Sequence, residues 1–289
     1  MSLADGDHEL TTRPAPVSIL KPGQEEAVWR LIAQNPQRHC FAAARLASGG
    51  LRSDLLGGQI WGAGDPARLE SAMLVGANMV PIQATAAAIS GFADFAVRQG
   101  RRCSSIVGSA AEVIRLWQHL EPWWGPARDV RPDQPFLVAT APARVSPDLR
   151  VRRARTAEME PVFSACVEMF TEEVGVSPLI AGGEAGYRRK IAEMIKAGRS
   201  FVRFEGNTPI FKAELGAVSA HACQVQGVWV HPDYRGQGLA SAAMTQVVEL
   251  AKTHAPMVTL YVNAYNERAL AAYRQAGFVR TDRFATVLF

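Results

Sequence analysis

The spacing of hydrophobic residues in the second half of the chain predicts strands and helices in a regular order. Continuous or alternating apolar runs, typical of strands, occur at residues 149–154, 200–206, 209–219, 221–230, 256–264 and 278–289. Apolar residues three or four positions apart, typical of helices, occur at residues 157–173, 183–198, 239–254 and 266–277. The predicted order is βααβββαβαβ, and Thr156 is expected to cap the first helix.

The first half of the chain shows a blurred version of the same order. Helical patterns occur at residues 23–34, 37–47, 86–100 and 109–124, and strand patterns at 56–63, 71–84, 103–108 and 134–141. Two interpretations remain open at this point: a degenerate repeat of the fold of the second half, or a coincidental α/β layout.

A short polar stretch between Pro142 and Pro147 separates the two halves and predicts a linker. We therefore expect a disordered tail at 1–16, an N-terminal α/β domain at 17–141, a linker at 142–148 and a second domain at 149–289.

Composition narrows the classes of function. The chain has 289 residues, of which 48% are hydrophobic, and a net charge of +4 without a dense block of Lys or Arg. We expect no nucleic-acid partner. No apolar run approaches the roughly 18 residues of a membrane span, and the polar first residues do not form a secretory leader, so no membrane contact is expected. Four widely separated cysteines favour reduced thiols, a cytoplasmic protein and no metal.

The most informative stretch is Arg235-Gly236-Gln237-Gly238, which lies between a predicted strand and a predicted helix. The helix carries an apolar stripe at Leu239, Ala243, Val247 and Ala251, and Ala240 and Ser241 keep its first turn slim. Helix N-termini attract anions, and glycines let a phosphate approach the backbone. The stretch predicts a backbone cradle for a pyrophosphate. The alternative is an ordinary glycine-rich turn, since the stretch lacks Gly-Lys-Ser/Thr and a third dinucleotide-binding glycine.

Two blocks of this half resemble the GNAT superfamily, the Gcn5-related N-acetyltransferases. Arg235 to Ala240 is similar to the Arg/Gln-x-x-Gly-x-Gly/Ala signature of that family. Asn266, Ala269, Tyr273, Gly277 and Phe278 match its second block, which begins 26 residues beyond Ala240. The resemblance covers roughly 149–289. The whole chain resembles proteins in which an uncharacterised N-terminal domain precedes a GNAT domain.

The resemblance implies an α/β (α+β) fold with a central mixed, mostly antiparallel sheet flanked by helices. It also implies acetyl-CoA or another acyl-CoA as co-substrate. Backbone groups of Val228, Trp229 and Val230 are expected to pair with the pantetheine arm, and Val230 to provide the N–H for the oxyanion. The pyrophosphate is expected at Arg235, Gly236, Gln237, Gly238, Leu239, Ala240 and Ser241.

The resemblance further implies that Tyr273 points at the CoA sulfur and is the catalytic residue that protonates or hydrogen-bonds the leaving thiolate. Asn266 contacts the pantetheine or caps its helix, and both alternatives stay open. The alternative for Tyr273 is an aromatic core residue on an amphipathic helix.

The general base is not evident. Relatives carry glutamate at the positions of Gln224 or Tyr261, and neither residue here is a competent base near neutral pH. Glu172, Glu173 and His221 border the expected acceptor entrance, although each also fits an ordinary surface residue. An ordered water held by Gln224 is the remaining possibility.

The predicted function is transfer of an acetyl group from acetyl-CoA to a primary amine by direct attack, with the acceptor undefined. The acceptor is a small molecule or a protein amine, and a homodimer is compatible with this interpretation. The alternative is a CoA-binding regulatory or interaction module with little turnover, because the usual carboxylate is missing and the first half carries no recognised motif.

Overall fold

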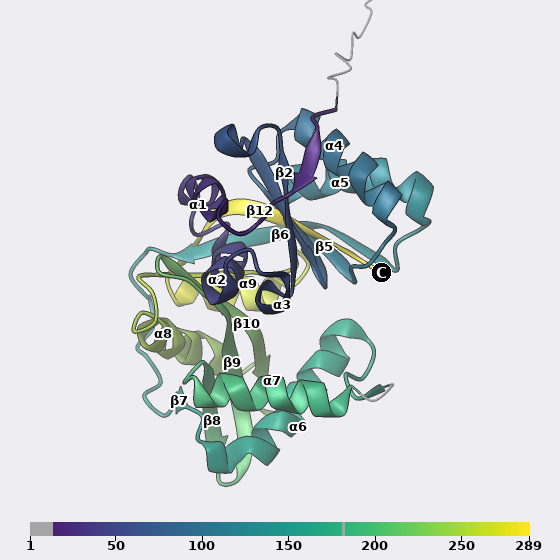
Figure 1. Cartoon of the computed structure of the whole chain (residues 1–289). Coiled ribbons are helices and arrows are strands. Elements are labelled where there is room, and N and C mark those ends of the chain that lie inside the picture. Colours follow the sequence, from purple (N-terminus) through teal and green to yellow (C-terminus); the bar gives the residue numbers. More distant parts are fainter. Residues whose placement is uncertain (1–13, 181–182) are drawn as a thin grey trace, which may run out of the picture. The chain divides into compact units, whose positions relative to one another are not determined.

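The computed structural model describes residues 14–180 and 183–289, which form two compact units (Figure 1). The first unit consists of residues 14–34, Ser48–Pro132 and Ala285–Phe289. The second consists of Asn35–Ala47 and Asp133–Phe284. Each unit therefore contains segments from both halves of the sequence.

The first unit is a sheet of short strands with helices. Its strands follow the order β1-β2-β3-β4-β5, and the end of β12 lies next to β5, with Phe289 N donating to Ser104 O at 3.1 Å. The elements that begin in this half are β1 (Val17–Ile19), α1 (Glu25–Ala33), α2 (Cys40–Gly49), α3 (Ser53–Leu56), β2 (Gly58–Ala63), β3 (Ser71–Gly76), β4 (Asn78–Ile82), α4 (Ala86–Gln99), β5 (Ser105–Ser109), α5 (Ala110–Trp124) and β6 (Asp129–Ala139).

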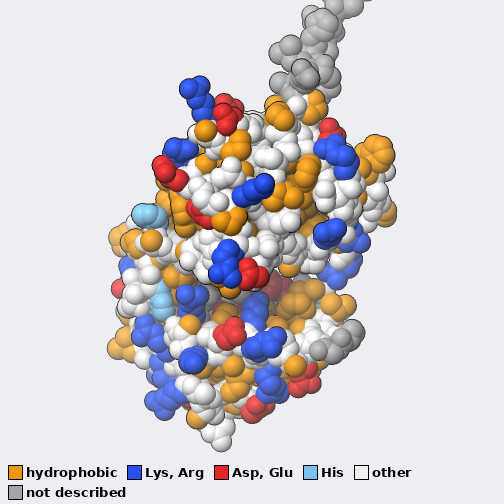
Figure 2. Space-filling model, in the orientation of Figure 1, with side chains coloured by type: hydrophobic (Ala, Val, Ile, Leu, Met, Phe, Trp, Pro, Cys, Tyr) orange, Lys and Arg blue, Asp and Glu red, His pale blue; other side chains and the backbone are white. Residues whose placement is uncertain are grey.

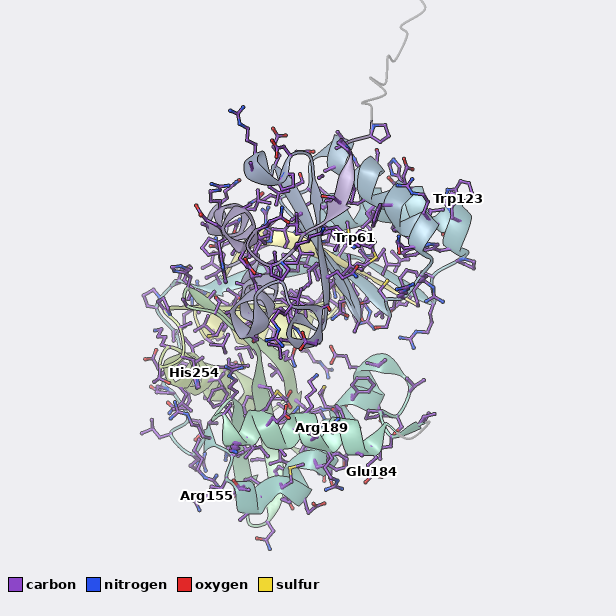
Figure 3. All side chains as sticks on the ribbon, viewed as in Figure 1. Trp61, Trp123, Arg155, Glu184, Arg189 and His254 are labelled. Atoms are coloured by element: carbon purple, nitrogen blue, oxygen red, sulfur yellow. The ribbon has the colours of Figure 1, made fainter. Side chains whose placement is uncertain are left out.

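The core of the first unit forms where α4 and α5 pack together against the strands. Phe92, Val113, Leu116 and Ile106 are fully buried there. Trp61 of β2, labelled in Figure 3, meets Phe95 of α4 edge-on, and the two ring centroids are 4.8 Å apart. The helical periodicity of α4 and α5 thus produces the apolar stripes that this core needs.

Two strands of the first half differ from the sequence-based prediction. Strand β1 was not expected, and residues 71–84 form the hairpin β3–β4 where one strand was expected. The turn falls at Ala77, between Gly76 and Asn78, inside the stretch where a single strand was expected.

The second unit contains the predicted order of elements. Within this unit the strand order is β12-β6-β11-β10-β9-β8-β7. The elements are β7 (Arg152–Arg153), α6 (Met159–Val174), α7 (Glu184–Lys196), β8 (Ser200–Glu205), β9 (Thr208–Val218), β10 (Ala222–Val230), α8 (Leu239–Ala251), β11 (Met257–Tyr261), α9 (Glu267–Gln275) and β12 (Phe278–Leu288).

Helices cover both faces of this sheet. Phe211, Ala213 and Leu215 of β9 pack into a core with Ala243, Met244, Val247 and Val248 of α8. The alternate residues of β9 point to the opposite face, where α6 and α7 lie side by side (Figure 1). The apolar stripe predicted for α8 is confirmed, because Ala243, Val247 and Ala251 are fully buried.

The predicted cap at Thr156 is wrong. Thr156 is the first residue of a 3₁₀ turn, Thr156–Glu158, that leads into α6. The side chain of Glu158 caps this turn instead, because it accepts the backbone N–H of Arg155 at 2.8 Å. Arg152 holds the same carboxylate through two hydrogen bonds of 2.6 and 2.9 Å, a contact that helix-start patterns do not include.

The last strand of each half divides between the units. Residues from Asp133 onward of β6 belong to the second unit, where Phe136 to Val138 pair with Tyr261 to Thr259 of β11. Residues from Ala285 onward of β12 belong to the first unit. The sheet of each unit is thus completed by a strand from the other half of the sequence.

The predicted linker stays a prediction. In the structure, residues 142–148 lie within the second unit, where Arg144 N donates to Gln275 O and Asp148 N to Ala242 O. Residues 1–13 of the predicted tail lie outside the described residues. Ala15, which follows them, donates its N–H to Ala87 O at 3.1 Å.

The surface mixes charges of both signs. On the face shown in Figure 2, basic and acidic side chains are interspersed around α7, and Arg188 of this helix forms ion pairs with Glu160 and Glu184. Among the residues that the structure describes, no helix has the length and apolar character needed to cross a membrane.

Candidate functional site

Strand β10 has an edge without a strand partner. Strands β10 and β11 run parallel but pair only from Ala222–Met257 to Gln224–Thr259. Beyond that point β10 continues to Val230 against β9, and no further pair joins it to β11 within the described residues. The outer part of β10 therefore presents backbone groups on its β11 side that an extended ligand can pair with.

The N–H of Val230 points to this open edge. His231 N donates to Ile210 O at 3.0 Å, and Val230 pairs with Phe211 one position further along β9. Neighbouring residues of an antiparallel ladder turn their N–H groups to opposite edges. Val230 thus directs its N–H away from β9, as the predicted role of an oxyanion donor requires.

Side chains of the β10–α8 turn hold the turn itself. Arg235 donates through Nε to Val230 O at 2.9 Å, and its two terminal nitrogens reach both carboxylate oxygens of Glu172 at 2.8 and 2.7 Å. Gln237 donates to Asp233 O at 3.0 Å. Both side chains were expected at the cofactor, and the structure places them in contacts that shape the loop and tie it to α6.

The backbone of the same turn is left accessible. Among the described residues, no hydrogen-bond acceptor is found for the backbone N–H groups from Gly236 to Ser241. Gly236 and Gly238 have φ values of +76° and +75°, and no atom lies within 4 Å of a Cβ placed on either. The left-handed backbone and the open approach explain why both positions are glycine. Six unpaired donors at the positive end of α8 make an arrangement that suits an anion.

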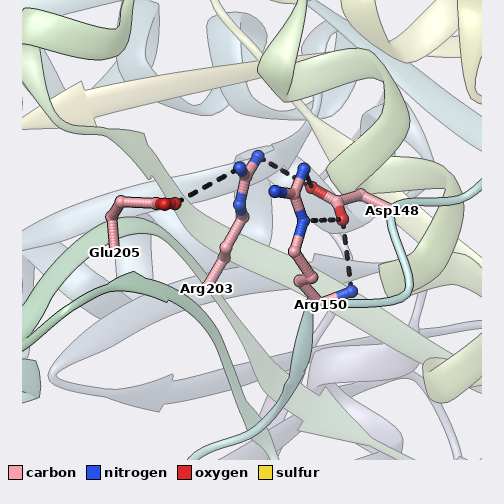
Figure 4. A network of polar contacts seen from close by, with 4 residues as sticks. All are labelled: Asp148, Arg150, Arg203 and Glu205. Atoms are coloured by element: carbon pink, nitrogen blue, oxygen red, sulfur yellow. Dashed lines mark hydrogen bonds and ion pairs between the residues drawn. The ribbon is translucent and has the colours of Figure 1, made fainter.

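A solvent-open pocket of about 380 Å³ borders this turn. Its lining includes Gln237, Gly238 and Leu239. On the opposite wall Asp148 accepts hydrogen bonds from Arg150 and lies 2.8 Å from a terminal nitrogen of Arg203 (Figure 4). Burial tends to raise the pKa of Asp148, but the two guanidinium groups outweigh it and lower that pKa. The carboxylate therefore stays charged and partly neutralises the arginines.

Helix α9 presents the second predicted block. Asn266 is its N-cap, and the side-chain oxygen accepts from Ala269 N at 3.1 Å, so the capping alternative is confirmed. Tyr273 is buried in the core, 5.9 Å from the ring of Phe278 between centroids. Burial and the nearby charge of Glu173 raise the pKa of its hydroxyl. The phenol thus stays protonated at neutral pH, and no hydrogen bond to it is found among the described residues.

The candidates for a base occupy different places. Gln224 lies where β10 and β11 diverge. Tyr261 packs on Phe284 at 5.3 Å between ring centroids. Glu172 is held by Arg235 in two hydrogen bonds, and His221 precedes β10, roughly 30 Å along the strand from its outer end. Glu173 follows Glu172 near the end of α6, and burial foremost, with the charge of Glu173, raises the pKa of Tyr273.

The corresponding turn of the first unit is closed. Between β4 and α4, Ala84 N donates to the carboxylate of Glu112 at 3.3 Å and Thr85 N donates to Ser71 Oγ at 3.0 Å. Thr85 then caps α4 by accepting from Ala88 N at 3.2 Å. The side chain of Glu112 thus lies where the second unit leaves its donors accessible.

Sequence reasoning passed over two buried charges near β10. Lys212 and Glu214 of β9 are 0% and 5% exposed, although both interrupt an apolar strand. Charged residues two positions apart in such a strand usually mark its solvent face. Only the packing of α6 over this face reveals that they are enclosed.

Two segments of the chain match models of protein families. Residues 168–278 match the model of the acetyltransferase (GNAT) family, and residues 58–162 match a domain of unknown function (DUF4081). No curated protein matches the sequence significantly.

Solved structures show the same fold over nearly the whole chain. A GCN5-related N-acetyltransferase from Sphaerobacter thermophilus is 17% identical, with a TM-score of 0.57, and the match covers 95% of this chain and 96% of that one. An acetyltransferase of the GNAT family from Colwellia psychrerythraea is 13% identical, with a TM-score of 0.54, and the match covers 94% of this chain and 99% of that one. A tandem GNAT protein from the clavulanic acid biosynthesis pathway is 14% identical, with a TM-score of 0.50, and the match covers 94% of this chain and 98% of that one.

The fold and the β10–α8 turn define an acetyltransferase-like architecture of the GNAT type. The chain carries a GNAT domain, and a domain of the DUF4081 type precedes it. Both halves share the order βααβββαβαβ, apart from the short α3 and the 3₁₀ turns. The degenerate repeat remains a prediction, and the shared order of elements is compatible with it.

Proposed function

We propose that the second unit transfers an acetyl group from acetyl-CoA to a primary amine by direct attack. The observation that supports this most is the continuity of two features: the unpaired edge of β10 leads directly into the turn with accessible N–H groups from Gly236 to Ser241. An elongated ligand with an amide-rich arm and a pyrophosphate at its end matches that sequence of contacts.

The residues assigned to acetyl-CoA act mainly through their backbone. Val228, Trp229 and Val230 pair with the pantetheine arm, and residues 236–241 receive the pyrophosphate. Arg235 serves the site indirectly, because its hydrogen bonds to Val230 O and Glu172 fix the start of the turn. Acetyl-CoA is favoured over longer acyl donors by family resemblance alone.

The proposed chemistry needs an oxyanion donor and a group at the leaving sulfur. The amine nitrogen attacks the thioester carbonyl carbon, and Val230 N–H stabilises the oxyanion that forms. The C–S bond then breaks and the thiolate receives a hydrogen bond, and finally a proton, from Tyr273 or through it. Because the raised pKa of Tyr273 makes it a weak acid, its main contribution is the hydrogen bond to sulfur.

The proton of the attacking amine needs a separate acceptor. We propose Glu173 for this role, directly or through a water, because it adjoins Glu172, which Arg235 ties to the start of the β10–α8 turn. Glu172 is a poorer choice, since the guanidinium of Arg235 engages both of its oxygens.

The test is release of free CoA thiol from acetyl-CoA in the presence of a panel of amines, together with calorimetric titration of acetyl-CoA. The panel contains polyamines, aminoglycosides, amino acids, and peptides with a free N-terminus or a lysine. We expect binding, and turnover with at least one class that is lost in Glu173→Gln and kept in Glu168→Gln, a carboxylate on the same helix.

Each result has a distinct meaning. Binding without turnover across the panel would favour the CoA-binding regulatory module and contradict the proposed transfer. Turnover that Glu173→Gln leaves unchanged would support the transfer but exclude Glu173 as the base, and would favour a water held by Gln224.

A further inference from the structure

An ion pair is enclosed beneath β10 in the second unit. Lys212 Nζ lies 2.8 Å from Glu214 Oε1, and both side chains point to the face of β9 that α6 covers. Cys166 of α6 donates through its sulfur to the same carboxylate oxygen at 3.1 Å. Among the described residues, the ammonium group has this ion pair but no partner that meets hydrogen-bond geometry.

Both partners of this pair are charged. Burial by itself would lower the pKa of Lys212, but the adjacent carboxylate outweighs burial and raises it. Burial would raise the pKa of Glu214, and the ammonium outweighs it in the opposite direction. A buried ion pair of this kind adds little stability compared with two apolar side chains of similar volume, because both ions lose their hydration. Stability is therefore a poor explanation for the pair.

The pair lies directly under an irregularity of β10. The register runs from Gln226 opposite Glu214 to Trp229 opposite Lys212, so two residues of β10 face one residue of β9. This is a β-bulge, and Gly227 within it has a φ of +58°. A Cβ on Gly227 would lie 3.1 Å from Lys212 Nζ and 3.3 Å from Glu214 Oε2. Glycine thus lets the bulged backbone rest against both charges.

We propose that Lys212 and Glu214 are positioning residues that set the path of β10 through the bulge at Gly227. The backbone beyond the bulge, up to Val230, is the part that receives the acyl thioester, so this inference rests on the proposed function. A bulge interrupts the regular hydrogen bonds between β9 and β10. The alternation of side chains alone therefore does not fix the register of the two strands at this point. A buried ion pair is stable only in the few side-chain conformations that keep its two charges in contact. Because the backbone of Gly227 rests on this pair, the fixed pair restricts where the bulge can lie.

The test replaces the pair by apolar residues of similar size in Lys212→Met/Glu214→Leu. Single variants are avoided, because each leaves an unpaired buried charge and destabilises the protein for that reason alone. We expect unchanged or higher stability in urea, a Kd for acetyl-CoA within about 3-fold of wild type, and a kcat at least about 10-fold lower. Glu249→Leu/Lys252→Met removes an exposed pair of the same chemistry on α8 and is expected to leave all three values unchanged.

A double-mutant cycle then tests whether the pair acts through the bulge. Gly227→Ala places a methyl group against Lys212 and Glu214 and strains a left-handed residue, so it is also expected to lower kcat by about 10-fold. If the ion pair and the bulge act as one unit, kcat of the combined variant falls by far less than the product of the two separate fold-decreases in kcat.

The outcomes separate the inference from the function on which it rests. A folded Lys212→Met/Glu214→Leu variant with full kcat would overturn the positioning role. Fold-decreases in kcat that simply multiply when this variant is combined with Gly227→Ala would overturn it too. A double variant that fails to fold would assign the pair to stability instead. A wild type without turnover, but with acetyl-CoA binding intact, would overturn the proposed transfer and this inference with it.

Discussion

Gly238 illustrates how a single residue prepares the proposed phosphate site. Its left-handed backbone ends the turn, and the space beside it is open, so α8 begins with its N–H groups accessible. At the start of α9, by contrast, the side-chain oxygen of Asn266 accepts a hydrogen bond from one of the first N–H groups of the helix, that of Ala269. The two residues show why one helix start suits an anion and the other a cap.

The first prediction concerns Gly238→Glu. A glutamate adds bulk and negative charge where the phosphate is proposed to approach, so acetyl-CoA affinity should fall by at least about 100-fold in calorimetric titration. Gly206→Glu is the matched control, because Gly206 also has a left-handed backbone, at +58°, and open space in the β8–β9 turn. Both variants share the backbone strain, and only the first should lose binding. Unchanged affinity in Gly238→Glu would contradict the assignment of the turn.

The second prediction concerns Tyr273→Phe. The ring and its packing on Phe278 remain, so stability should change little. Loss of the hydroxyl should lower kcat by roughly 10²-fold while the Kd for acetyl-CoA stays near that of wild type. Tyr265→Phe, which changes an exposed tyrosine in the loop before α9, is the control. Full kcat in Tyr273→Phe would show that this tyrosine is a packing residue and that solvent protonates the thiolate.

At the scale of elements, α2 is the clearest departure from its place in the sequence. It comes from the N-terminal half, yet residues 35–47 belong to the second unit. Cys40 donates to Ala222 O at 3.1 Å, and Arg38 forms an ion pair with Asp282. His39, which precedes the helix, is 2% exposed, and burial foremost, with the charge of Arg38, lowers its pKa to about 4, although Asp282 opposes this.

The third prediction follows from His39. Its pKa in the folded protein lies below the ordinary value of 6.5, so the unfolded chain binds more protons between these pH values. The contribution of His39 to stability is complete above about pH 6.5 and is lost as the pH falls towards 4, by up to about 3 kcal/mol. Denaturant unfolding between pH 4 and 7 measures this. His39→Leu should flatten the dependence and His119→Leu, an exposed histidine on α5, should not. An equal slope in both variants would assign the pH dependence to other groups.

At the scale of the whole molecule, the two halves of the sequence share one order of elements but differ at one turn. The turn at the start of α8 is accessible, whereas the turn at the start of α4 is filled by the carboxylate of Glu112 and by Ser71. The order of elements is thus the same in both halves, but only the turn of the second half offers the features of an anion site.

The fourth prediction is that one acetyl-CoA binds per chain. In the described part of the first unit, the side chains of Glu112 and Ser71 accept the N–H groups of Ala84 and Thr85, so these donors are not available to a second pyrophosphate. Titration calorimetry of the full chain should give a stoichiometry of one, and Gly238→Glu should abolish the only transition. A second transition that survives in Gly238→Glu would locate a CoA site elsewhere in the chain.

The fifth prediction concerns a fragment of residues 149–289, which tests the predicted linker. This fragment lacks residues 133–139, whose strand pairs with β11, and lacks α2, which packs on β10. It should unfold at much lower urea concentration than the full chain, or fail to fold, because β11 would become an exposed edge. A fragment with cooperative unfolding and acetyl-CoA affinity would support a domain boundary at 142–148.

Much of the second unit is predictable because its signals are local. The periods of the apolar residues predicted its strands and helices, the glycines of residues 235–238 predicted a turn with accessible donors, and Asn266 predicted a cap. Each of these depends on residues within one or two turns of each other, where backbone geometry follows directly from residue type.

Other features depend on residues that are distant in sequence, and only the tertiary structure decides them. Four such features bring together separate segments of the chain. Strands β6 and β12 divide between the units, and α2 packs on the second unit. Glu172 binds Arg235, and Lys212 and Glu214 are enclosed under α6. The period of a strand shows that one of its faces differs from the other, but not what covers either face. Whether a charge is solvated or buried, and whether a helix start is open or filled, therefore depends on packing that local pattern does not encode.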